Sequence, residues 1–134
     1  MIVSCNSYNK RMISYGFGAC NHSWGWTKIT VYDNGLVIIN STKEFKLKIH
    51  QSAASKVFDA LEKEHFFELN KSYINKNVVG GYCQEMLYNS DNMTKKVEIA
   101  NTPVIQINRI ADKLFKVLDD HSTNWRNYTS SAKK

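Results

Sequence analysis

Residues 27–39, TKITVYDNGLVII, carry the signal that decides the fold. Ile29 and Val31 alternate with polar residues, and this period of two is typical of a half-buried strand. Asn34-Gly35 follows, and a second β-rich run begins at Leu36. Asn-Gly between two such runs favours a type I′ turn, which needs a positive φ at both central residues. We therefore expect an antiparallel hairpin here.

The chain beyond this hairpin alternates once more and then changes its period. After a turn at residues 40–42, apolar side chains at positions 45, 47 and 49 alternate with charged ones, which predicts a third strand. Residues 51–65 instead carry their apolar side chains at helical spacing, on the stripe Ala54, Val57, Phe58 and Leu61. Ser52 is either the N-cap of this helix or a residue of its first turn.

The second half of the chain returns to strands and ends in another helix. Residues 70–81 are polar and end in two glycines, so we expect a loop. Residues 82–88 and 95–100 are typical of a second hairpin. Thr102-Pro103 favours a helix start, because threonine caps helices and proline is tolerated at the first helical position. An apolar stripe then continues to about Asp120.

These elements together predict an α+β fold. With residues 11–17 as a further candidate strand, we expect an antiparallel sheet of about five or six strands with two amphipathic helices packed on one face. A length of 134 residues suits one domain. We expect an N-terminal segment of residues 1–10, a single domain of residues 11–120, and a polar C-terminal tail of residues 121–134 with Trp125 and Tyr128 as anchors.

The opening residues MIVSC end as bacterial lipoprotein signals end, with a small residue and then the cysteine that carries the lipid. The charged start and apolar core of such a signal are missing, so residues 1–10 are either the remnant of a longer envelope protein or a chance match. The other cysteines are Cys20 and Cys83. Because the total of three cysteines is odd and no C-x-x-C motif occurs, the sequence indicates neither a disulfide framework nor a zinc ribbon.

Three segments, GAC at 18–20, TKITVY at 27–32 and DNGLVI at 33–38, resemble a small uncharacterised family of bacterial lipoprotein-associated α+β envelope domains. In that family a cysteine-containing segment leads into an alternating strand and a D/N-G turn, then a helix ending near Phe-Phe, a hairpin and a final helix. The resemblance covers residues 15–118, although Asn21 stands where many members have proline after the cysteine. It implies the fold and a place in the cell envelope, and no activity.

Catalytic and metal-binding patterns are weak in this chain. Cys20 and His22 lie two residues apart, which makes them either a nucleophile and its base or an ordinary cysteine beside a polar histidine. The four histidines show no metal-ligand spacing, and no phosphate-binding glycine loop or nucleophile elbow occurs. The carboxylate pairs Glu62/Glu64 and Asp119/Asp120 favour solvated surface charge. We therefore expect no enzyme activity, no cofactor and no metal.

The sequence gives stronger indications of a binding function, and the net charge of +6 is one of them. The lysines of the predicted strands would form a basic face if all point to solvent, beside aromatic residues on which bases could stack; they are Lys28, Lys46, Lys48 and Lys96. A second basic stripe, Arg109, Lys113 and Lys116, lies on the last helix, where i,i+4 pairs with Asp112 and Asp120 explain most of the charge. Trp24 and Trp26 are either a core plug or a protein-binding pair.

These features predict a non-enzymatic binding or inhibitor module that engages a protein or a protein–RNA complex through its basic face. By class alone, such a small basic chain is also similar to anti-CRISPR inhibitors of RNA-guided nucleases. Residues 24, 26, 28, 46, 48, 96, 109 and 113 would contact the partner and its RNA phosphates. This hypothesis places the protein in the cytoplasm. The alternative is a cell-envelope domain, lipid-anchored at Cys5, with a structural or immunity role.

Overall fold

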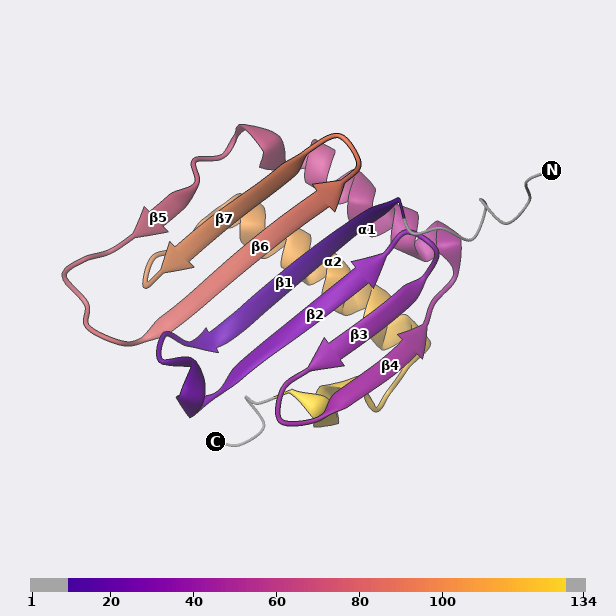
Figure 1. Cartoon of the computed structure of the whole chain (residues 1–134), viewed down its shortest axis with the longest axis horizontal. Coiled ribbons are helices and arrows are strands. Elements are labelled where there is room, and N and C mark those ends of the chain that lie inside the picture. The colour runs from indigo at the N-terminus through magenta and orange to yellow at the C-terminus, as the bar shows by residue number, and fades with distance from the viewer. Residues whose placement is uncertain (1–9, 130–134) are drawn as a thin grey trace.

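A computed structural model describes residues 10–129 of the chain. They form one mixed sheet of seven strands, two α-helices and three short 3-10 turns (Figure 1). In chain order the elements are β1 (Arg11–Ala19), η2 (His22–Trp24), β2 (Trp26–Tyr32), β3 (Leu36–Asn40), β4 (Glu44–Lys48), α1 (Gln51–Lys63), η3 (Phe66–Glu68), β5 (Ser72–Ile74), β6 (Tyr82–Ser90), β7 (Thr94–Ala100), α2 (Ile105–His121) and η4 (Trp125–Tyr128).

The predicted α+β class is confirmed, with differences in the sheet. Its order is β4-β3-β2-β1-β6-β7-β5, and all neighbours are antiparallel except β5 and β7. The expectation of an all-antiparallel sheet of five or six strands is therefore wrong in detail. The extra strand, β5, lies inside residues 70–81, where we expected a loop. A strand of three residues, of which only Tyr73 packs against the core, is too short to show a period in the sequence.

The hairpin of β2 and β3 forms where predicted, with a different turn. The backbone N–H of Gly35 donates to the carbonyl of Tyr32, and Val31 pairs with Val37 across the hairpin. Among residues 33–35 only Gly35, at φ 97°, has a positive φ, so the expected type I′ turn is not present. The side chain of Asn34 instead accepts the backbone N–H of Leu36. A loop of three residues with glycine last is the other common hairpin solution.

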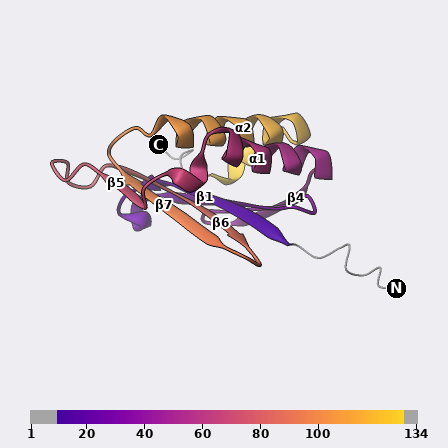
Figure 2. The ribbon, with the colours of Figure 1, turned by 90° about the horizontal axis from the view of Figure 1, so that it is seen from above.

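Both helices lie on the same side of the sheet, and within residues 10–129 no helical layer covers the other side, here called the open face (Figure 2). Alternate residues of β1, β2, β3, β6 and β7 are buried beneath them, including Ile13, Ile29 and Ile39. The helical stripes supply the other half of the core, with Val57, Leu61, Ile107, Ile110 and Leu114 among its buried members. The apolar side chains that alternate along the strands and those that recur at helical spacing therefore pack together in one core.

The last helix begins later than the sequence suggests. α2 begins at Ile105, and Val104 rather than Thr102 is the residue before it. Val104 is extended and only 6% exposed, so its side chain enters the core instead of starting a helical turn. In α1 the second alternative holds, since Ser52 lies in the first turn.

The described part of the predicted tail, residues 121–129, packs against the domain. Trp125 is 1% exposed, and its indole N–H donates to Asp119 at 2.8 Å. Tyr128 stacks on Phe45 of β4 with ring centroids 4.4 Å apart. Both predicted anchors therefore contact the fold. The predicted lipid attachment at Cys5 lies outside the described residues. Neither of the two α-helices described is apolar enough over its length to cross a bilayer.

Candidate binding surface

A disulfide joins Cys20 to Cys83 at one end of the open face, with a Cα–Cα distance of 4.8 Å. The cysteine count and spacing, which indicated no disulfide framework, did not predict this single bond. β1 and β6 are antiparallel neighbours, and Gly18 lies opposite Cys83, so Cys20 leaves β1 beside its partner. The two cysteines are 63 positions apart in the chain, and only the strand pairing reveals the contact.

The disulfide also removes the candidate nucleophile. A half-cystine has no thiolate to attack a substrate, so the pairing of Cys20 with His22 as nucleophile and base does not hold for the oxidised protein. His22 instead stacks on the ring of Trp26, with centroids 3.7 Å apart and planes at 20°. Among residues 10–129, no three or more His, Cys, Asp or Glu side chains are grouped as a metal site would need.

A hydrogen-bonded turn carries the exposed tryptophan of this region. The side chain of Asn21 accepts hydrogen bonds from the backbone N–H and the hydroxyl of Ser23, and the carbonyl of Asn21 accepts the N–H of Trp24. Trp24 is 76% exposed, so it does not plug the core. Trp26 is half-buried, on the open face of the sheet, with its ring against Gly16. Any β-carbon at position 16 would lie 2.7 Å from that ring.

The open face has an apolar centre. Strand register aligns Leu36 with Lys48, Ile38 with Lys46, and Thr30 with Ile38 and Ser14. The apolar side chains of this centre come from four adjacent strands and are all partly exposed; they are Met12, Tyr32, Leu36, Ile38 and Leu87. Nothing among residues 10–129 folds over them, because both helices lie on the other side (Figure 2).

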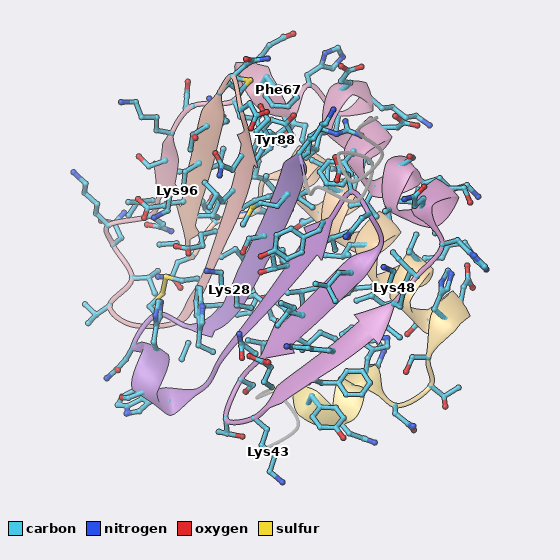
Figure 3. All side chains as sticks on the ribbon, turned by 45° about the vertical axis from the view of Figure 1, so that its right-hand side comes forward. Lys28, Lys43, Lys48, Phe67, Tyr88 and Lys96 are labelled. Carbon is cyan, nitrogen blue, oxygen red and sulfur yellow. A yellow bond between two sulfur atoms is a disulfide. The ribbon has the colours of Figure 1, made fainter. Side chains whose placement is uncertain are left out.

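The four predicted sheet lysines all lie on this face and are exposed, as Figure 3 shows for Lys28, Lys48 and Lys96. They surround the apolar centre instead of forming one basic field. Lys96 lies within 3.8 Å of Glu85 and 3.4 Å of Glu98. Lys46 lies 3.7 Å from Glu44. Within residues 10–129, Lys28 and Lys48 make no ion pair within 4 Å.

The helical part of the predicted site lies on the other layer. Arg109 and Lys113 belong to α2, so the structure does not bring them together with the sheet lysines. Arg109 lies 3.5 Å from Glu64 of α1. Lys113 borders a hollow of about 220 Å³ between the helices with Lys56 and Lys116. The pairs that we expected between Lys116 and its i,i+4 carboxylates are not among the ion pairs of residues 10–129.

A second hollow, of about 390 Å³, lies on the open face between η2 and the turn that joins β3 to β4. Trp24, Trp26 and Lys28 border it on one side. Asn40, Ser41 and Thr42 border it on the other, because Asn40 pairs with Lys28 across the sheet. From the sequence we predict only a turn at residues 40–42. Short polar residues between strands carry no further signal, and only the register shows what they face.

Comparison with protein-family models and with curated proteins finds no match for this chain.

Proposed function

We propose that this domain is a non-enzymatic binding module that engages a protein surface through the open face of its sheet. The observation that carries the proposal is the composition of that face. An apolar centre, which includes Ile38 and Leu87, is bordered by exposed lysines and glutamates. Protein interfaces have this anatomy, with an apolar middle and a polar rim that remains in contact with water.

The charges on this face favour a protein over a bare polyanion. Nucleic acid binding draws its affinity from several cations that neutralise phosphates. Here Lys46 and Lys96 lie beside carboxylates of the same chain, which leaves Lys28 and Lys48 for such contacts. A rim of both signs suits a protein partner of complementary charge. The sequence led us to predict an RNA-guided nuclease as one candidate partner. If the partner is such a nuclease, Lys28 and Lys48 would contact RNA phosphates at the edge of the protein interface.

Affinity capture from native lysate tests this proposal, with variants that separate the two layers. Ile38→Thr keeps the β-branched shape and removes apolar contact from the open face. Ile105→Thr is the matched control, because Ile105 is 58% exposed on the helical layer. We expect capture of the partner to fall about tenfold with Ile38→Thr and to stay unchanged with Ile105→Thr.

The result contradicts the proposal if both variants capture the same proteins equally. A ribonuclease-treated sample extends the test, since a partner held by its protein surface stays bound after the RNA is removed. If capture is lost completely after ribonuclease and Ile38→Thr has no effect, the partner is bound through RNA and the proposed protein interface is wrong.

The disulfide favours a second candidate, a cell-envelope domain with a structural or immunity role. Disulfides form and persist in oxidising compartments and are rare in the cytosol. The resemblance to lipoprotein-associated envelope domains supports the same location. Alkylation of free thiols in intact cells before lysis tests it. We expect Cys20 and Cys83 to remain unmodified until a reductant is added, whereas rapid modification of both would place the protein in a reducing compartment.

A further inference from the structure

The hollow between η2 and the β3–β4 turn combines two kinds of chemistry. Trp24 and Trp26 offer indole rings, and Trp24 presents most of its ring to solvent. Opposite them lie Asn40 and Thr42, whose side chains carry an amide and a hydroxyl, with Lys28 beside them. Figure 3 shows Lys28 rising from the open face, and Figure 2 shows the purple segment that holds η2 on this same side of the sheet.

The backbone that carries Trp24 is held in place before any ligand arrives. The chain on either side of η2 is tied by the disulfide of Cys20, by the N–H of Ala19 donating to Gly25 at 2.9 Å, and by the side chain of Asn21. A site held in its binding geometry loses little conformational entropy on binding. Trp24 is 76% exposed on this turn, and tryptophan is enriched among the residues that contribute most to binding.

The mixture of groups selects the class of ligand. A pyranose ring has a flat face of C–H bonds that packs on an indole, and its edge carries hydroxyls that both donate and accept hydrogen bonds. Asparagine and threonine side chains match such hydroxyls, because each also donates and accepts. A nucleic acid would require several cations along its backbone, and the hollow has one lysine.

We propose that this hollow binds a pyranose unit of a saccharide, with its C–H face on Trp24 and its hydroxyls on Asn40, Thr42 and Lys28. This saccharide site goes beyond the protein-binding function proposed above and does not depend on it. Trp24 and Trp26 are thereby assigned to a ligand at one end of the open face, while the apolar centre around Ile38 remains the surface for a protein.

NMR titration of the ¹⁵N-labelled protein tests the saccharide site. The probes are a neutral trisaccharide (cellotriose), an N-acetylated one (chitotriose) and an acidic one (trigalacturonic acid), with a uridine hexanucleotide as the alternative. We expect at least one saccharide to shift the indole N–H of Trp24 and the amides of residues 40–42 with a Kd of about 1 mM or tighter. The indole N–H of Trp125, 1% exposed in the core, should not move.

Variants locate the binding. Trp24→Ala and Asn40→Ala should each weaken it by about tenfold or more, and both positions are exposed, so the spectrum of the folded protein should be retained. Lys28→Ala should weaken binding of the acidic trisaccharide, and Lys48→Ala, on the same face outside the hollow, is its matched control. Shifts that persist in Trp24→Ala, shifts with the hexanucleotide alone, or no shifts with any saccharide would each overturn the proposal.

Discussion

The disulfide between Cys20 and Cys83 should contribute a large share of the stability of this domain. It connects residues 63 positions apart, and the entropy that a loop of this length loses in the unfolded chain corresponds to about 4 kcal/mol at 25 °C. A single domain unfolds with a total of about 5–15 kcal/mol. For a chain of 134 residues, the same loss lowers the melting temperature by about 14 °C.

Urea unfolding of two matched proteins measures this contribution. Cys5→Ser removes the third thiol and leaves the Cys20–Cys83 bond as the only one that can form, and the triple variant with Cys20→Ser and Cys83→Ser lacks it. We expect the triple variant to be less stable by about 4 kcal/mol. Its m-value should be larger, because without the cross-link the unfolded chain expands and exposes more surface.

Two results would refute this reasoning. If the unfolded Cys5→Ser protein, purified without reductant, titrates with two free thiols, the bond is absent. If the bond is present but its removal costs less than about 1 kcal/mol, the entropy of the unfolded chain is not what the disulfide restricts.

Three further substitutions probe the contacts that hold the C-terminal segment and the ring of Trp26 in place. Trp125→Ala should cost about 3–5 kcal/mol in urea unfolding, because the indole is fully buried; a cost below about 1 kcal/mol would mean that the C-terminal segment does not anchor the fold. Hydrogen bonds from Arg126 and Trp125 lower the pKa of the Asp119 carboxyl, so the carboxylate stabilises the fold above the ordinary carboxyl pKa, and this contribution disappears as pH falls through the lowered folded value. Asp119→Asn should therefore cost about 1 kcal/mol at neutral pH and nothing in strong acid, and equal costs at both pH values would contradict the assignment. Gly16→Ala should displace the ring of Trp26, costing about 1–3 kcal/mol and shifting tryptophan emission; unchanged emission would show that the ring does not lie there.

Local patterns predicted most of the fold. The alternation in residues 27–32 and the helical spacing in residues 107–118 depend only on which side chains face the core, and both elements are present. The failures occur where a distant contact decides the backbone. Val104 is extended because the core takes its side chain, and β5 exists because β7 offers it a backbone edge. The residues around Val104 and those of β5 carry no local signal that would predict these distant contacts.

The candidate site was predictable in its composition and not in its arrangement. Outward-facing lysines follow from alternation, and the structure places all four of them on the open face. Glu44 and Glu98 follow in the same way, because each lies two residues from its lysine on the same strand. Glu85 does not follow, because it contacts Lys96 from a neighbouring strand. Asn40 lies beside Lys28 for the same reason, through the pairing of β2 with β3.

The amino-acid sequence by itself determined the α+β class, the approximate extent of the helices and main strands, and the face that each of them buries. Only the tertiary structure decided that Cys20 meets Cys83, that Glu85 of a neighbouring strand lies beside Lys96, and that a polar turn faces Trp24 across a hollow. The physical reason is the range of the interactions involved. Periodicity arises between residues a few positions apart, whereas strand register brings together side chains that are remote in the chain.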